Sequence, residues 1–278
     1  MIRRSSPKSP VNKRKSAFVS ALRSLGRAFA FCTGRASGWI GSLIRAVWVS
    51  RPGSRWYALW ARRVVLVVVL VHLAFMTLTS TALFAYKFVN PPTTGIRLYR
   101  ALGFGWKLQR RRNLKLAEVP KRTRTMIIRV EDGAFYSHRG VQLSALKNAR
   151  RLNEHLGRTV YGGSTITMQT ARTLFLVPEK NYLRKYLEII IALEMEVILS
   201  KNRIFELYLN NAEWGKGVFG IEAAARHHYG RGIRSLTVDE TIRLVTLLSS
   251  PIKYTPATIH KNGILKARYE YLESRFRE

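Results

Sequence analysis

The chain has 278 residues, a formal net charge of +32 and a single cysteine, Cys32. This length accommodates one or two domains with a sizeable core, and so large a positive charge predicts an anionic partner: nucleic acid, an anionic membrane surface or a phosphorylated substrate. One cysteine excludes an internal disulfide and a cysteine-based zinc site.

The N-terminal part of the chain is a polycation. Residues 1–63 carry 14 basic side chains and no acidic one, and the first acidic residue of the chain is Glu118. Residues 16–50 alternate apolar residues with arginine, which fits either a basic amphipathic helix on a membrane surface or a disordered tail. The charge distribution therefore predicts a basic tail over 1–63 followed, further along, by a moderately basic globular domain.

An uncharged apolar run of 23 residues covers 64–86 and has basic residues on both flanks. About 20 apolar residues are enough to cross a bilayer as a helix. The alternatives are a buried core helix and a cleaved signal peptide, for which the preceding tail is too long. The excess of positive charge before the run predicts a single span with its N-terminus in the cytoplasm.

Residues 87–117 are predicted to be a basic, membrane-proximal connector. Within it, residues 96–112 combine arginines with aromatic side chains, which suggests that they rest on the outer membrane face.

The remaining residues, 118–278, predict a mainly α-helical domain. Apolar residues recur at a helical period over 181–200. A further helix is expected to end at Gly230, and another, within 236–250, to begin at a threonine cap and stop before Pro251.

The first candidate catalytic residue is Glu131, in the stretch VEDGAFYSHRG (130–140). A general base is a carboxylate held near the proton that it removes, in surroundings that raise its pKa. The neighbours Ile128 and Phe135 are apolar, so a half-buried position is plausible. The alternative is an exposed acid or a helix cap.

The second candidate site is YGGSTITMQTARTLFL (161–176), where two glycines precede Ser164, Thr165 and Gln169. Small residues let backbone amides approach a ligand, and hydroxyl and amide groups bind sugars or phosphates. The alternative is a glycine turn that leads into a helix capped by Ser164 or Thr165. The stretch lacks the Gly-Lys-Ser/Thr ending of a phosphate-binding P-loop.

The third candidate is LRKYLE (183–188), which places Arg184 and Glu188 four residues apart with Lys185 beside them. They form either a surface ion pair or a second active-site carboxylate whose charge is balanced by bases. Two carboxylates with several lysines and arginines suit glycosyl transfer from a phosphate-bearing substrate, because cations hold the leaving phosphate.

Taken in order, these motifs resemble those of the peptidoglycan glycosyltransferases, glycosyltransferase family 51. The resemblance covers roughly residues 118–278 and is closest to the monofunctional members. It rests on EDGAFYSHRG (131–140), GGSTITMQ (162–169), RKYLE (184–188), KNRIFELYLN (201–210) and WGKGVFGIEAAARHHYGR (214–231).

The resemblance implies a lysozyme-like, mainly α-helical head with a membrane-associated jaw. It implies polymerisation of lipid II on the outer, periplasmic face of the bacterial inner membrane. Glu131 would be the general base that deprotonates the 4-hydroxyl of the acceptor sugar. The undecaprenyl diphosphate of the donor would leave, and the linkage would invert to β-1,4.

The resemblance also assigns the remaining site residues. Glu188 would be the second carboxylate, which stabilises developing charge or a Mg or Mn ion at the diphosphate; no organic cofactor is implied. Lys201, Glu206 and Asn210 are expected to be structural. The expected substrate-binding residues are Ser164, Thr165, Gln169, Arg172, Lys180, Arg184 and Lys185.

Three positions depart from the family pattern: Met168, Gln142 and Asn148. They are expected in the cleft or on the acceptor side, where Lys147, Arg150 or Arg151 would replace the missing charge. These departures leave open a catalytically silent relative that acts as a membrane scaffold.

A lysozyme-like glycan hydrolase is another alternative, because such enzymes also use paired carboxylates. A nucleic-acid partner is disfavoured by the membrane span. A second, penicillin-reactive domain is not expected. The expected partners are lipid II, the growing glycan strand, the membrane, and other proteins of cell-wall synthesis and division.

Overall fold

The computed structural model describes residues 56–155, 162–179 and 181–277. Most of the predicted basic tail, including 16–50, lies outside the described residues. The chain divides into two compact units, Met1–Phe75 and Met76–Glu278. Helix α2 (Trp56–Tyr86) runs across the boundary between these units.

Helix α2 has the properties of a membrane span. Of its 31 residues, only Thr79 and Leu83 are buried. Among the described residues, α2 is the one helix that is long and apolar enough to cross a bilayer. A core helix would be covered by other parts of the protein, whereas α2 exposes apolar side chains such as Val64 and Val71. This agrees with the span predicted over 64–86.

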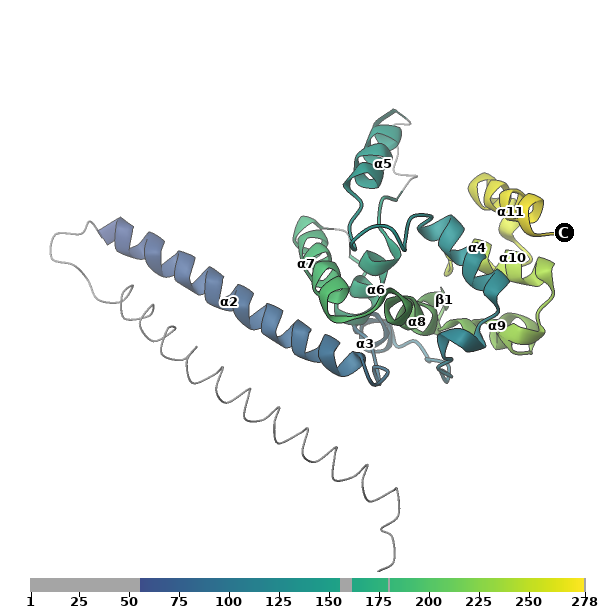
Figure 1. The fold of residues 1–278 in the computed structure, drawn as a ribbon, viewed down its shortest axis with the longest axis horizontal. Helices are drawn as coiled ribbons and strands as arrows, with labels where there is room; N and C mark the ends of the chain where they lie inside the picture. Colours follow the sequence, from purple (N-terminus) through teal and green to yellow (C-terminus); the bar gives the residue numbers. More distant parts are fainter. Residues whose placement is uncertain (1–55, 156–161, 180, 278) are drawn as a thin grey trace, which may run out of the picture. The chain divides into compact units, whose positions relative to one another are not determined.

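The second unit is built mainly from helices, as predicted, with one short antiparallel hairpin (Figure 1). The helices are α3 (Gly95–Phe104), α4 (Lys121–Glu131), α5 (Leu143–His155), α6 (Ile166–Phe175), α7 (Tyr182–Ile198), α8 (Lys201–Asn211), α9 (Ile221–Tyr229), α10 (Val238–Leu247) and α11 (Gly263–Phe276). The hairpin strands are β1 (Glu213–Gly215) and β2 (Val218–Phe219), and short 3-10 helices cover Leu116–Glu118, Ile233–Ser235 and Ile259–Lys261.

Two groups of helices form this unit. Helix α6 packs against α7, α8 and α3, and most of its side chains are buried. Helix α4 packs against α10 and α11, and α9 contacts α8 and the hairpin. The site described below lies where the C-terminal end of α4 meets the N-terminal end of α6.

The helix ends follow the local sequence. Thr237 caps α10 by a reciprocal pair of hydrogen bonds with Glu240. Gly230 ends α9 with a φ of 71°, a left-handed conformation that favours glycine. The predicted threonine cap and glycine stop are therefore confirmed, and α7 confirms the helix predicted within 181–200.

The residues that follow the span are folded against the helices. The backbone of Leu114 donates to and accepts from the side chain of Asn210, at 2.9 and 2.8 Å. The amide of Leu116 donates to Glu206 at 2.7 Å. Asn210 and Glu206 thus hold this segment on α8, which is the structural role expected of them.

Gly140 is required by its surroundings, because its φ is +80° and an added Cβ would lie 2.8 Å from Cγ of Glu196 and 3.0 Å from the oxygen of Ala192. We expect Gly140→Ala to reduce the free energy of unfolding by about 2 kcal/mol. Thermal denaturation measures this loss. Gly133→Ala is the matched control: φ there is not positive and the nearest contact is 3.9 Å away. Equal stability of the two variants would contradict the close packing at Gly140.

Candidate functional site

The adjacent acids Glu131 and Asp132 have different environments. Asp132 is buried, and its carboxylate accepts from the amide of Ile166 at 2.9 Å and pairs with Nε2 of His138 at 2.9 Å. Asp132 therefore ties the start of α6 to the loop after α4. Phe135, which is fully buried against Phe205, anchors the same loop. Both acids line the cavity described below, but the Asp132 carboxylate is already bonded to Ile166 and His138. Glu131, the last residue of α4, is therefore the better candidate for a base.

Glu131 is held from two sides. Nε2 of Gln169 donates to Oε2 of Glu131 at 3.0 Å, and Nη2 of Arg268 donates to Oε1. The Glu131 side chain is 10% exposed. It is therefore neither the exposed acid nor the cap of the alternative interpretation, but a partly buried carboxylate with a fixed orientation.

Tyr208 fixes the orientation of Gln169. Its hydroxyl donates to Oε1 of Gln169 at 3.4 Å, so the amide nitrogen of Gln169 points to Glu131. Burial, and secondly the charge of Glu131, raise the pKa of Tyr208 well above its usual value. The tyrosine hydroxyl thus stays protonated at neutral pH and remains a donor.

A cavity of about 190 Å³ opens beside Glu131. Polar groups and glycines line much of it, which suits a hydroxyl-rich ligand. The residues around it come from the end of α4, the start of α5 and the glycine-serine motif. They include Arg129, Glu131, Gln142, Gly162, Gly163 and Ser164.

The second predicted carboxylate, Glu188, lies in a buried ion cluster. Its side chain has no exposed surface. One oxygen accepts from Nη1 of Arg184, and the other accepts from Nζ of Lys185 at 3.0 Å. The alternative of a weak surface pair does not apply, because a buried carboxylate depends on such partners to offset its desolvation.

Lys185 connects the two carboxylates, because its Nζ also donates to Oγ of Ser164 at 2.8 Å and Ser164 lines the cavity beside Glu131. Burial lowers the pKa of Lys185, and the charge of Glu188 opposes this shift. Arg172 adds positive charge near Lys185 and Tyr208. The site thus has a carboxylate at one end and a group of cations at the other.

The hydroxyl of Thr165 forms its hydrogen bonds within the protein. Its hydroxyl caps α6 by accepting from the amide of Met168, and donates to the oxygen of Gly140. Of the two cap candidates, Thr165 is the one that caps the helix, and Ser164 keeps its hydroxyl at the cavity.

The interpretation of Met168 as a cleft residue is wrong. Its side chain has no exposed surface and belongs to the core around α6. A thioether is well suited to such packing. This departure from the family pattern therefore changes the core beneath the site and not its lining.

The other residues that depart from the family pattern, and the basic residues expected to compensate for them, do not all lie together. Gln142 lines the cavity, whereas Asn148, Lys147 and Arg151 are exposed on α5. Two predicted groups lie outside the described residues: Lys180, and the side chain of Arg150.

Sequence reasoning missed Arg268 and Tyr208. Tyr208 lies within the KNRIFELYLN motif, so its position was visible but its contact with Gln169 was not. Arg268 is one of many basic residues in a basic chain and is 137 residues from Glu131. No local pattern could identify it as the partner of the base.

A protein-bound metal does not fit this site as described. Both oxygens of Glu188 already accept from Arg184 and Lys185. Within the described residues, no group of three or more histidines, cysteines or acids has metal-binding proximity. A divalent ion would need most of its ligands from elsewhere.

The chain matches a family model and several named relatives. Residues 99–275 match the model of the Transglycosylase family. A protein of Cupriavidus metallidurans is 38% identical over 222 residues, which is 77% of this chain and 94% of the relative. Another, of Paraburkholderia xenovorans, is 36% identical over 211 residues, 73% of this chain and 85% of the relative. A third, of Shewanella frigidimarina, is 33% identical over 229 residues, 81% and 91% respectively. All three are named biosynthetic peptidoglycan transglycosylase.

Proposed function

Because the chain belongs to the transglycosylase family and is a peptidoglycan glycosyltransferase, we propose that it polymerises lipid II with Glu131 as the general base. The observation that carries this assignment is the position of Glu131: it is partly buried, fixed by Gln169 and Arg268, and open to a polar cavity. A carboxylate so placed meets the geometric requirement for a general base.

The proposed step is a single displacement at the anomeric carbon of the donor. Glu131 accepts the proton of the acceptor 4-hydroxyl while the hydroxyl oxygen forms a bond to that carbon. The bond from the carbon to the diphosphate oxygen breaks, and undecaprenyl diphosphate leaves with the electron pair. The configuration inverts, and the product carries a β-1,4 linkage.

The cations at the other end of the site are proposed to hold the leaving diphosphate. Arg172 supports this role because none of the described carboxylates bonds to its side chain. Arg184 and Lys185 supply further charge, with Glu188 as their internal counter-ion. Charge that develops on a phosphate oxygen is stabilised best by donors that are already in place.

No organic cofactor enters this proposal. A Mg or Mn ion would arrive bound to the diphosphate, which would supply most of its ligands together with water. Three proposed roles are independent of such an ion. Glu131 takes the proton, Gln169 orients the base, and Ser164 lines the acceptor cavity.

We assign the N-terminus to the cytoplasm and the catalytic unit to the periplasmic face of the bacterial inner membrane. The support is the basic tail before α2, together with the helix itself. A single anchor keeps the enzyme in the plane in which its lipid-linked substrate diffuses. The growing glycan strand is the second proposed partner, and other cell-wall synthesis and division proteins are the third.

A glycan hydrolase is the main competing function. Glycosidases that use two carboxylates need both groups to act at the scissile bond. Glu188 is unsuited to this, because it is buried and both its oxygens are bonded to cations. The cations themselves suit a diphosphate better than a neutral glycan.

The test uses the full chain in detergent with fluorescent lipid II, Mg²⁺ or Mn²⁺, and separation of the products on a gel. We expect a ladder of glycan strands and release of undecaprenyl diphosphate. The same protein is then incubated with preformed, uncrosslinked strands, which should keep their length. Shortened strands would establish a hydrolase, and no change in either substrate would indicate a scaffold.

A further inference from the structure

Arg268, which lies 137 residues further along the chain, forms an ion pair with the proposed base. It lies on α11, and its Nη2 bonds to Oε1 of Glu131, a residue at the end of α4. The side chains are 16% and 10% exposed. At this burial, a charge-assisted hydrogen bond is stronger than one on the surface.

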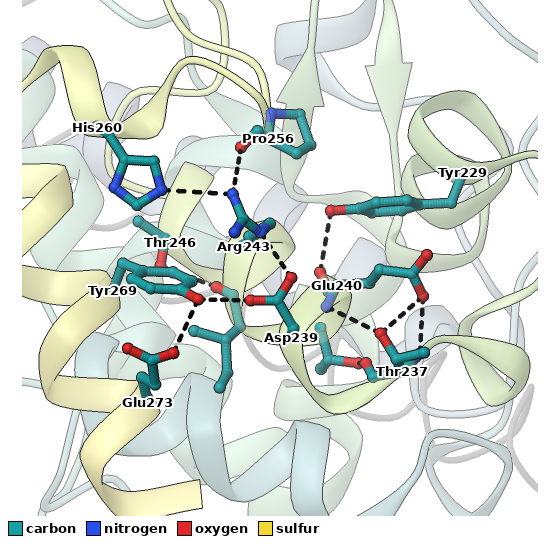
Figure 2. A network of polar contacts seen from close by, with 12 residues as sticks. Tyr229, Thr237, Asp239, Glu240, Arg243, Thr246, Pro256, His260, Tyr269 and Glu273 are labelled. Atoms are coloured by element: carbon teal, nitrogen blue, oxygen red, sulfur yellow. Dashed lines mark hydrogen bonds and ion pairs between the residues drawn. The ribbon is translucent and has the colours of Figure 1, made fainter. Parts of the chain in front are cut away.

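The position of Arg268 is fixed by the next residue, Tyr269. Figure 2 shows the Tyr269 hydroxyl between the carboxylates of Asp239 and Glu273. Asp239 in turn accepts from Nε of Arg243 at 2.7 Å. Burial, and secondly the hydrogen bond to Asp239, raise the pKa of Tyr269 to about 12, so it remains a donor at neutral pH. The Tyr269–Asp239 hydrogen bond therefore holds helix α11 against α10.

The two residues face different neighbours because successive helical side chains are about 100° apart. Tyr269 points to α10 (Figure 2), and Arg268 points to the end of α4. Asn262 also fixes the start of α11 by accepting from the amides of Ile264 and Leu265. The guanidinium is thus held at Glu131 by a rigid helix and not by a flexible tail.

Other charged groups around the base have partners or locations of their own. Asp132 is paired with His138, and Arg172 belongs to the cation group of the site. On α10, Asp239 and Arg243 bond to each other.

Other charged residues of α10 and α11 form ion pairs of their own. Glu240 of α10 pairs with Arg231, and on α11 Lys266 pairs with Glu270 and Arg277 with Glu273. Arg129 lies over the ring of Phe276 and lines the cavity beside Glu131. Among the described residues, Arg268 is the cation with a direct bond to Glu131.

We propose that Arg268 is a positioning residue for the general base: its guanidinium fixes the rotamer of the Glu131 carboxylate between α6 and α11. The proposal rests on the proposed function. A carboxylate that is held in one orientation, within hydrogen-bond reach of the proton that it removes, meets the geometric requirement for a general base.

The test measures kcat and KM of lipid II polymerisation by the full chain for the parent, Arg268→Met and Arg268→Lys. We expect Arg268→Met to reduce kcat about 10- to 100-fold with little change in KM, because the base loses its fixed orientation while the substrate contacts remain. Arg268→Lys keeps a cation that can bond to Oε1 of Glu131 and should restore most of the rate.

Lys266→Gln is the matched control, because Lys266 lies on the same helix and is 57% exposed; its kcat and KM should equal those of the parent. An Arg268→Met variant with the parental kcat, or an Arg268→Lys variant as slow as Arg268→Met, would overturn the proposal, since a positioning cation predicts a loss of rate that lysine reverses. Thermal denaturation monitors folding. If the methionine variant is unfolded, kcat and KM are measured for Arg268→Gln instead, with the same expected result. A parent without activity would refute the proposed function instead.

Discussion

Glu131→Gln will reduce the rate of lipid II polymerisation by about a thousandfold, the loss expected when a general base is removed. Glutamine has nearly the same shape as glutamate, so the cavity beside residue 131 and its lining by Ser164 stay in place. The amide cannot accept the proton of the acceptor hydroxyl. Rates from a continuous fluorescence assay, with binding of lipid II measured separately, should show a loss in kcat and retained affinity.

Glu270→Gln is the control for this experiment. Glu270 lies on α11 and is 57% exposed in a pair with Lys266, so its neutralisation should leave the rate unchanged. If Glu131→Gln kept more than about a tenth of the parental rate, the proton would have to go to another group, and Glu131 would lose its assigned role.

Glu188→Leu will have the largest effect on stability. Its carboxylate is fully buried and neutralises Arg184 and Lys185. Removal of one partner of a buried ion pair costs about 3 kcal/mol, because the other charges are left uncompensated. For a protein of this size, this corresponds to a Tm decrease of roughly 6–12 °C. Activity measured well below the new Tm should still fall about a hundredfold, because the cations are no longer held in place for the diphosphate.

A double variant separates the two roles of this cluster. Glu188→Leu combined with Arg184→Met removes one charge of each sign and should recover part of the lost Tm. It should not recover activity, because a diphosphate contact is also lost. Full recovery of both properties would show that the cluster serves stability alone.

Much of the fold could be predicted from the sequence because the signals are local. The apolar period that predicts α7, the threonine at the start of α10 and the glycine after α9 each act within a few residues. The resemblance to the family also predicted that Glu131, Gln169 and Glu188 share one site. Local spacing could not say that Lys185 bridges Ser164 and Glu188.

The rest could not be predicted because it depends on which face of a helix is buried. Met168 and Gln169 are neighbours in the sequence, yet the first lies in the core and the second at Glu131. Thr165 and Ser164 differ in the same way, since one hydroxyl caps α6 and the other meets Lys185. Only the packing of α6 against α7 and α8 determines these orientations.

The separation of 137 residues between Glu131 and Arg268 has a consequence for biosynthesis. At a synthesis rate of about 5–20 residues per second, α11 emerges on the order of ten seconds after α4. Until then the nascent chain carries Glu131 but not Arg268, the cation that bonds to it. A chain that ends before α11 is therefore expected to lack the contact that fixes the orientation of the proposed base.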